Sequence, residues 1–221
     1  TYEIKNRMPR TFAICVYSVI ASALIGIPMG VLAAVKQNKL ADKIVLFVSS
    51  VLMCVPNFWV ALMLVVLFAL KLRWLPPYGI GGIEYYIIPC FAILITSFAG
   101  IARQMRSSML EVIRSDYIMS ARAQGYSRRV INYMHALPNA IIPIITTMGQ
   151  QFARGLGGTI ILETIFSIPG MGLYIQGGIA KRDIPVVTGS IIFLGILFSF
   201  IMLVIDLLYA AADPRIKAQF A

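Results

Sequence analysis

The sequence predicts an all-α polytopic membrane protein, and three observations support this fold class. Of the 221 residues, 59% are hydrophobic and only 13% are charged, whereas a soluble domain is usually near half apolar and a quarter charged. The mean hydropathy is +0.85. The charged residues are also unevenly spread, because long stretches contain none. Backbone groups in lipid must bond within their own segment, so these apolar stretches are expected to be helices.

Five stretches are long enough to cross a bilayer, which takes about 20 apolar residues. The predicted spans cover residues 11–35, 44–70, 85–108, 136–162 and 186–209. Prolines and glycines occur inside several of them, and membrane helices tolerate both as kinks and close contacts. No internal repeat or soluble domain is evident, so residues 1–221 are predicted to form a single transmembrane domain.

The basic residues between the spans predict their orientation, because cytoplasmic loops carry an excess of Lys and Arg. If residues 36–43 lie inside, inner segments hold eleven of the 19 Lys and Arg residues and outer segments hold seven. The inner set is Lys36, Lys39, Lys43, Arg103, Arg106, Arg114, Arg122, Arg128, Arg129, Arg215 and Lys217. This bias places the loop at residues 109–135 in the cytoplasm. It also attributes the net charge of +10 to membrane orientation rather than to nucleic-acid binding.

The predicted cytoplasmic loop has the features of a short capped helix. Ser115 or Asp116 can accept a backbone N–H at its start, as residues at a helix N-cap do. Residues 117–124 then form about two turns. Gly125 follows and can take the left-handed conformation that ends a helix, which other side chains resist. A second helix, capped by Ser127, is expected to lead into the fourth span.

The short helix carries small residues flanked by positive charge. Ser120, Ala121 and Ala123 would let another protein approach the backbone closely, and Ile118 lies three residues before Ala121 on one face. Arg122, Arg128 and Arg129 surround the helix with positive charge. These features suit a socket on a partner protein. They suit equally well a helix that rests on the membrane surface with its arginines at the headgroups, and the residues alone leave both interpretations open.

The stretch DYIMSARAQGYSRRVINYMHALPNA, which starts at Asp116, resembles the cytoplasmic loop of binding-protein-dependent ABC importer permeases. The family pattern is Glu-Ala-Ala, three residues, Gly, nine residues, Ile, one residue and Leu-Pro. In this chain Ala121 takes the second Ala position and Gly125 takes the Gly position. Leu137 and Pro138 stand where the pattern requires them.

Three positions depart from that pattern and indicate a branch of the family. Met119 replaces the Glu, Ser120 replaces the first Ala and His135 replaces the Ile. The form Ala-Arg-Ala-x-Gly, present here at residues 121–125, is typical of the peptide and nickel branch.

Further motifs extend the resemblance along most of the chain. They are Arg7-Met8-Pro9-Arg10-Thr11, Val55-Pro56-Asn57-Phe58-Trp59, Leu72-Arg73-Trp74-Leu75-Pro76, the segment 162–172, the segment 182–187 and Ala212-Asp213-Pro214-Arg215-Ile216. Together they are similar to the B-type subunit of dipeptide, oligopeptide and nickel importers. This resemblance implies a type I ABC importer permease core of the MetI-like kind, with six spans expected in the full-length subunit and five in this chain.

In that family the short loop helix is a coupling helix that docks in a groove of a cytoplasmic ATPase subunit. The resemblance implies a set of ATPase-coupling residues: Asp116, Tyr117, Ser120, Ala121, Arg122, Ala123, Gln124, Gly125, Leu137 and Pro138. It implies no catalytic residue and no cofactor in this chain, because the partner ATPases bind ATP and Mg. In agreement, the sequence contains no Gly-x-x-x-x-Gly-Lys-Ser/Thr phosphate loop.

The resemblance also implies the rest of an import complex. The partners would be a second homologous permease of the C-type, two cytoplasmic ATPases and an extracytoplasmic binding protein, in the bilayer of a bacterial or archaeal cytoplasmic membrane. The cargo would be dipeptides or oligopeptides, with nickel or a metal chelate as the alternative. An ion channel is a remote alternative, since no repeated filter or charge ring is apparent. A non-transporting membrane scaffold is the other remote alternative, and the sequence offers no such argument against it.

A few polar residues inside the spans are candidates for the translocation pathway, namely Arg154, Gln150 and Asn57. Ionisable groups within a membrane usually face a cavity or a partner charge. Glu163 is expected near the outer rim. It lies about 13 Å from Arg154 along a continuous helix, so the two are not expected to pair. No metal site is predicted, because His135 has no Cys or carboxylate near it in the sequence.

Overall fold

The computed structural model describes residues 2–212, and the chain folds into two compact units. Unit 1 comprises Thr1–Ala21, Val55–Thr96 and Gln150–Leu203, and unit 2 comprises Ser22–Cys54, Ser97–Gly149 and Val204–Ala221. Residues 213–221 lie outside the described part. They include most of the last family motif and the predicted inner charges Arg215 and Lys217.

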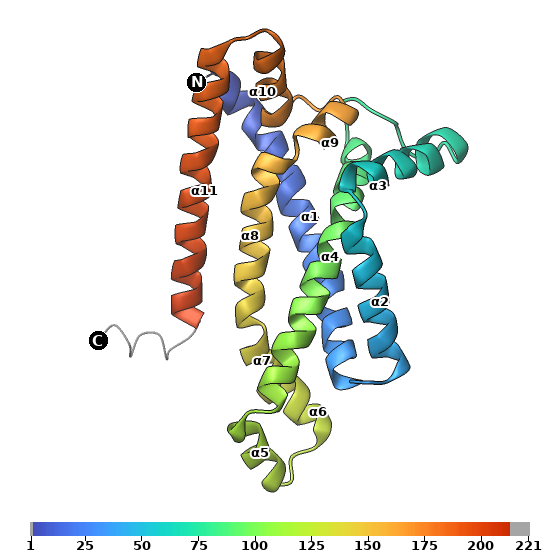
Figure 1. Ribbon diagram of the computed structural model, residues 1–221, viewed down its shortest axis with the longest axis vertical. Helices are drawn as coiled ribbons and strands as arrows, with labels where there is room; N and C mark the ends of the chain where they lie inside the picture. Colours follow the sequence, from blue (N-terminus) through green and yellow to red (C-terminus); the bar gives the residue numbers. More distant parts are fainter. Residues whose placement is uncertain (1, 213–221) are drawn as a thin grey trace. The chain divides into compact units, whose positions relative to one another are not determined.

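Every regular element of the described residues is a helix (Figure 1). The elements are α1 (Tyr2–Val35), α2 (Leu40–Cys54), α3 (Asn57–Leu64), the π-helical η1 (Val65–Lys71), α4 (Glu84–Ile113), α5 (Asp116–Ala123), α6 (Arg128–Val130), the π-helical η2 (Ile131–Ala136), α7 (Leu137–Ala140), α8 (Ile142–Gly158), α9 (Ile160–Ile165), α10 (Met171–Ala180) and α11 (Ile184–Ala212). The predicted all-α fold class is confirmed.

Three helices of the described part are long and apolar enough to cross a membrane. They are Tyr2–Val35, Glu84–Ile113 and Ile184–Leu207. The first two contain the predicted spans 11–35 and 85–108. The helix α4 continues past residue 108 to Ile113, so the connecting loop starts later than predicted. The reason is packing, because Met105 and Met109 are fully buried.

The predicted span 44–70 is not one continuous helix. The helix α2 ends at Cys54 and α3 begins at Asn57, so the chain breaks at Val55 and Pro56. Pro56 is extended, with φ −64° and ψ 136°. Its ring lacks the N–H that a continuing helix needs and disfavours helical geometry at the preceding residue. If the two pieces are counted as one broken span, they supply a fourth candidate.

The predicted span 136–162 is also divided, into η2, α7, α8 and α9, with a turn at Ile141 and an interruption at Thr159. Pro143 follows the first interruption and removes one backbone donor. Gly158 precedes the second and is a weak helix former. The longest piece, α8, has 17 residues, fewer than the roughly 20 of a straight crossing. Continuous helices therefore do not reproduce the predicted count of five.

Unit 2 is built on a close contact between α1 and α4. A Cβ atom added to Gly26 would lie 2.9 Å from the Phe98 carbonyl oxygen, and one added to Gly30 would lie 2.5 Å from the Ala102 carbonyl oxygen. Small residues therefore let these two backbones meet, as in other membrane helix pairs. The buried core of this unit consists of Ala23, Val31, Ala34, Ile101, Met105, Met109, Ile118, Ala121, Ile131, Ala136, Ala140 and Ile144.

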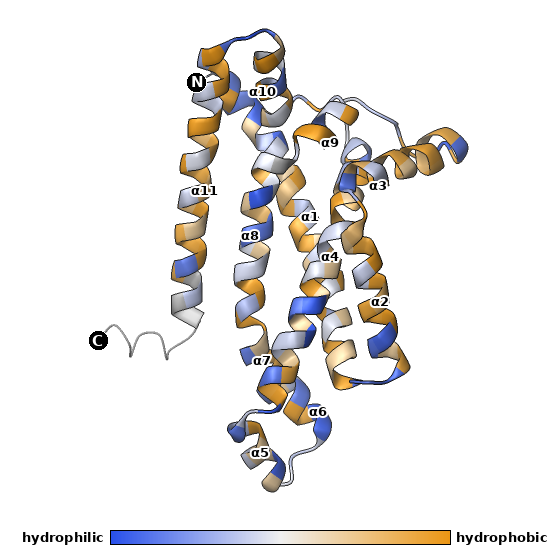
Figure 2. Cartoon of the chain, viewed as in Figure 1, coloured by the Kyte–Doolittle hydropathy of each residue, from blue (hydrophilic) through white to orange (hydrophobic). Residues whose placement is uncertain are grey.

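Unit 1 has its own apolar core, formed by parts of α1, α3, α4 and α9 around Phe166. The carbonyl oxygen of Phe166 accepts a hydrogen bond from the Gly79 N–H at 2.8 Å, which joins the loop after η1 to the end of α9. Figure 2 shows apolar colouring along most of α11. Exposed side chains there include Ile196 and Phe200, as expected of a helix that faces lipid.

Candidate functional site

The predicted coupling segment centres on α5, a helix of eight residues. Ser115 occupies its N-cap position with extended φ −71° and ψ 155°. The predicted capping bond is not made, because the Ser115 hydroxyl donates to the Val112 carbonyl oxygen at 2.6 Å. Ser115 therefore closes α4 rather than capping α5. The second predicted cap is confirmed, since the Ser127 hydroxyl accepts the Val130 N–H at 3.4 Å.

Gly125 ends α5 as predicted, with a left-handed φ of +85°. Its N–H donates to the Arg122 carbonyl oxygen at 3.0 Å, and the Tyr126 N–H donates to the Ala121 carbonyl oxygen at 3.3 Å. Nothing lies within 4 Å of the place where a Cβ atom would stand. The backbone conformation, and not a lack of space, therefore requires glycine here.

The helix α5, labelled in Figure 1, has two faces that differ in burial. Ile118 is fully buried and Ala121 is 8% exposed, and both pack into the core of unit 2. Met119, Ser120 and Ala123 are exposed. The face that holds Ile118 and Ala121 thus belongs to the chain's own core. Asp116, Tyr117 and Arg122 of α5 are exposed as well. The name outer face of α5 is used below for Met119, Ser120 and Ala123.

Tyr117 and Asn139 join α5 to α7. The Asn139 side-chain amide donates to the Tyr117 hydroxyl at 2.9 Å and to the His135 carbonyl oxygen at 3.1 Å. The Tyr117 hydroxyl donates to the same carbonyl oxygen at 3.4 Å. Leu137 and Pro138 lie between His135 and Asn139 in the sequence, and both belong to α7, the helix to which Tyr117 is joined through Asn139. The sequence did not single out Asn139, although it directly follows the Leu-Pro pair.

An ion pair that the sequence did not predict stabilises unit 2. The Asp42 carboxylate of α2 accepts two hydrogen bonds from the Arg106 guanidinium of α4, at 2.5 and 2.8 Å. It also accepts the Asn38 N–H at 2.8 Å and is 1% exposed. One turn away, Arg103 donates to the Ser50 hydroxyl at 2.8 Å. Two of the predicted inner charges therefore bind α4 to α2. The sequence did contain a signal for this ion pair, because Asp42 is the one acidic residue among the lysines of residues 36–43.

A second buried carboxylate lies in unit 1. Glu163 is fully buried in α9, where it accepts the hydroxyls of Thr11 at 2.6 Å and Thr159 at 3.0 Å and the Leu173 N–H at 2.9 Å. The Thr11 hydroxyl in turn accepts the Met171 N–H at 2.9 Å. Both N–H groups belong to the first turn of α10, which has no helical partner for them. Thr11 and Glu163 therefore cap α10 from two other helices.

The three predicted pathway residues all have exposed side chains in unit 1. Arg154 Nε donates to the Gln150 carbonyl oxygen at 3.3 Å, and the two residues share one face of α8. Asn57 is the first residue of α3. The Glu163 carboxylate is bound by Thr11, Thr159 and Leu173 rather than by Arg154, in agreement with the expectation that the two would not pair.

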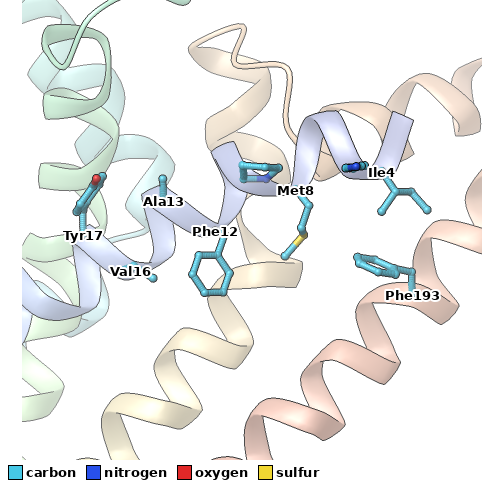
Figure 3. A pocket seen from close by; sticks show the side chains of 9 residues that line it. Ile4, Met8, Phe12, Ala13, Val16, Tyr17 and Phe193 are labelled. Atoms are coloured by element: carbon cyan, nitrogen blue, oxygen red, sulfur yellow. The ribbon is translucent and has the colours of Figure 1, made fainter. Parts of the chain in front are cut away.

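A cavity of about 880 Å³ runs along the first half of α1 in unit 1. Figure 3 shows Met8 and Phe12 of α1 and Phe193 of α11 around it. Sites that orient a ligand combine apolar walls with a few convergent polar groups. Among the described residues that line this cavity, only Lys5 and Tyr17 have side chains with a polar end. The lining therefore matches a lipid-facing surface better than a peptide site.

Metal-ligating side chains are scattered. Within residues 2–212, no group of three or more His, Cys, Asp or Glu side chains is placed to hold a metal ion. The ring of His135 lies 5.2 Å from that of Tyr126. Cys15, Cys54 and Cys90 form no disulfide.

Comparison with known proteins gives one family over most of the chain. Residues 26–218 match the family described as binding-protein-dependent transport system inner membrane component. The dipeptide transport system permease protein DppB of Alkalihalophilus pseudofirmus is 39% identical, over 97% of this chain and 73% of the relative. The oligopeptide transport system permease protein AppB of Bacillus subtilis is 34% identical, over 97% of this chain and 71% of the relative.

Solved structures share the fold. A structure of the MetNI methionine ABC transporter in an inward-facing conformation aligns with a TM-score of 0.79, over 96% of this chain and 97% of that chain. The identity is 18%, so this likeness concerns the arrangement of helices.

Proposed function

The chain belongs to the family of binding-protein-dependent transport system inner membrane components, and we propose that it is the permease subunit of an ATP-driven importer of dipeptides or oligopeptides. The relatives named for dipeptide and oligopeptide transport support this cargo. The structural observation that carries the proposal is α5, a short helix with one face packed in the chain's own core and the other exposed. That arrangement suits a rigid docking element.

In this proposal the chain crosses the cytoplasmic membrane of a bacterium or archaeon five times. The crossings are α1, the broken pair of α2 with α3 and η1, α4, the divided segment from α7 to α9, and α11. The helix α5 lies on the cytoplasmic side, since most Lys and Arg residues then fall in inner segments. Interruptions within spans are tolerated where protein rather than lipid surrounds the backbone.

We propose that the outer face of α5 docks in a groove of a cytoplasmic ATPase. Two such ATPases bind ATP and Mg, and this chain contributes no catalytic group. The hydrogen bonds from Asn139 to Tyr117 and to the His135 carbonyl oxygen would carry a displacement of α5 into α7 and so into the fourth span. ATP shifts the complex between inward- and outward-facing states to the extent that it binds one state better.

The exposed face of α8 that holds Gln150 and Arg154 is the proposed contribution of this chain to the pathway. A second permease of the C-type would supply the opposite wall, and an extracytoplasmic binding protein would deliver the cargo. A guanidinium offers several donors that match a carboxylate, so Arg154 suits the C-terminus of a peptide. Asn57 is proposed as a further pathway residue because its side chain is exposed.

Reconstitution of the complex tests the proposal. The permease pair, both ATPases and the binding protein are placed in liposomes, and ATP hydrolysis is measured with dipeptides, longer peptides or a nickel chelate. We expect peptides to stimulate hydrolysis and the nickel chelate to leave it at the basal rate. Stimulation by the chelate alone would replace the peptide cargo with a metal cargo, and no stimulation by any cargo would argue against import.

A further inference from the structure

A second cavity, of about 360 Å³, lies in unit 2 beside α5. This volume is within the range of small-molecule sites. One wall is apolar and comes from the ends of two membrane helices, with Ala34 and Val35 from α1 and Leu110 and Ile113 from α4. The cavity therefore lies where apolar segments of the chain end.

Two positively charged side chains also line the cavity. Arg122 and Arg128 line it together with Tyr126 and Asn132. The Arg122 guanidinium donates to the Ile113 carbonyl oxygen at 3.3 Å, which holds this side chain over the end of α4. None of the described residues that line the cavity carries a carboxylate, so neither charge is neutralised within it. Paired guanidinium groups are well suited to bind phosphate oxygens.

The cavity is separate from the outer face of α5. Met119, Ser120 and Ala123 do not line it, and Arg122 is the predicted coupling residue that does. An ATPase that docks on the outer face would therefore leave the cavity to another ligand. The apolar wall makes a phosphate attached to an apolar group a better match than a side-chain carboxylate of the ATPase.

We propose that this cavity binds the headgroup of an anionic phospholipid, with the phosphate between Arg122 and Arg128 and the glycerol end against Val35 and Leu110. Anionic lipids of the inner leaflet attract basic residues at the membrane surface. A bound lipid would fill the space between the ends of α1 and α4 and the turn after α5. The site would thereby make the position of the coupling segment depend on lipid composition.

Lipid binding to the purified complex tests this assignment. The assembled transporter in detergent is titrated with phosphatidylglycerol or phosphatidylcholine of identical acyl chains, and bound lipid is counted by native mass spectrometry. We expect tighter binding of phosphatidylglycerol. Arg128→Gln should weaken it about tenfold, because a charge-assisted hydrogen bond to phosphate is lost. Arg128→Lys should weaken it less, since the charge remains without the planar fork.

Arg129→Gln is the matched control, because it removes the same charge from the next residue, which does not line the cavity. This variant should bind phosphatidylglycerol as the wild type does. Equal weakening by Arg128→Gln and Arg129→Gln would indicate general surface charge and overturn the proposal. Displacement of the lipid by millimolar inorganic phosphate would indicate a free-phosphate site instead. If the Arg128→Gln complex loses the ATPase while its lipid binding is unchanged, Arg128 belongs to the ATPase interface and the lipid proposal is overturned. None of these measurements depends on the transported cargo.

Discussion

The hydroxyl of Thr11 donates a hydrogen bond of 2.6 Å to the carboxylate of Glu163, which lies 152 positions further along the chain. The same hydroxyl accepts the Met171 N–H, and the carboxylate accepts the Leu173 N–H. One buried network thus joins the first part of α1, the short helix α9 and the first turn of α10. Such networks are stabilising while every member is satisfied and costly once a member is removed.

Thr11→Val should destabilise the permease, because it leaves both the Met171 N–H and the Glu163 carboxylate one partner short at nearly constant volume. The expected loss is about 1–3 kcal/mol, measured as a lower unfolding temperature of the purified complex. Thr11→Ser retains the hydroxyl and serves as the control. A Val variant as stable as the wild type would show that the network contributes nothing.

Gly170→Ala should weaken the same network from another side. A Cβ atom at Gly170 would collide with the Glu163 carboxylate, so the carboxylate must leave its donors. Gly157→Ala is the matched control, since nothing lies within 4 Å of its added methyl group. In a helix that control should change stability by up to about 1 kcal/mol in the stabilising direction. The unfolding temperatures of both variants are measured. Equal changes in the two temperatures would contradict the predicted collision at Gly170.

Asp42→Asn should destabilise unit 2 by about 3 kcal/mol, because the half-buried Arg106 guanidinium then lacks its counter-charge. A double-mutant cycle with Arg106→Gln measures the coupling between the two side chains. The double variant should be less unstable than the sum of the single ones. Arg103→Gln, which removes an exposed bond to Ser50, should change stability by only about 0.5 kcal/mol. Strictly additive effects of the first two substitutions would contradict the ion pair.

Gly125→Val should uncouple transport. The left-handed φ of +85° is strained for a residue with a Cβ atom by about 1–2 kcal/mol, and the turn after α5 would shift to relieve that strain. Gly125→Asn should remain coupled, because asparagine tolerates this conformation. The ratio of peptide-stimulated to basal ATP hydrolysis measures coupling. An assembled Val variant that imports peptide at the wild-type rate would refute the role of the turn.

Substitutions on the two faces of α5 should have different effects. Ala123→Trp enlarges the exposed outer face and should reduce co-purification of the ATPase with little change in the unfolding temperature of the permease. Ile118→Ala removes a fully buried side chain and should lower stability by about 2–5 kcal/mol. Co-purification and unfolding temperature are measured on the same preparations. If Ala123→Trp leaves the ATPase bound, the outer face is not the docking surface.

The predicted helix at 117–124 differs by one residue at each end from the observed α5, and Gly125 is left-handed as expected. These features were predictable because caps and turns depend on a few neighbouring residues. The break at Pro56 and the division of the fourth span were not predicted. Hydropathy adds the contributions of about 20 residues and is insensitive to one proline or one interruption within them.

The sequence by itself determined that this chain is helical, that long parts of it suit lipid and that a short helix ending at a left-handed Gly125 follows the third span. Apolar length and backbone preference are properties of consecutive residues, so they can be read along the chain. Only the tertiary structure decided that Ile118 faces the core and that Asp42 pairs with Arg106 and Glu163 with Thr11. These pairs are 64 and 152 positions apart. A buried charge takes its partner from whichever helix packs against it, and that packing is not encoded by any local pattern.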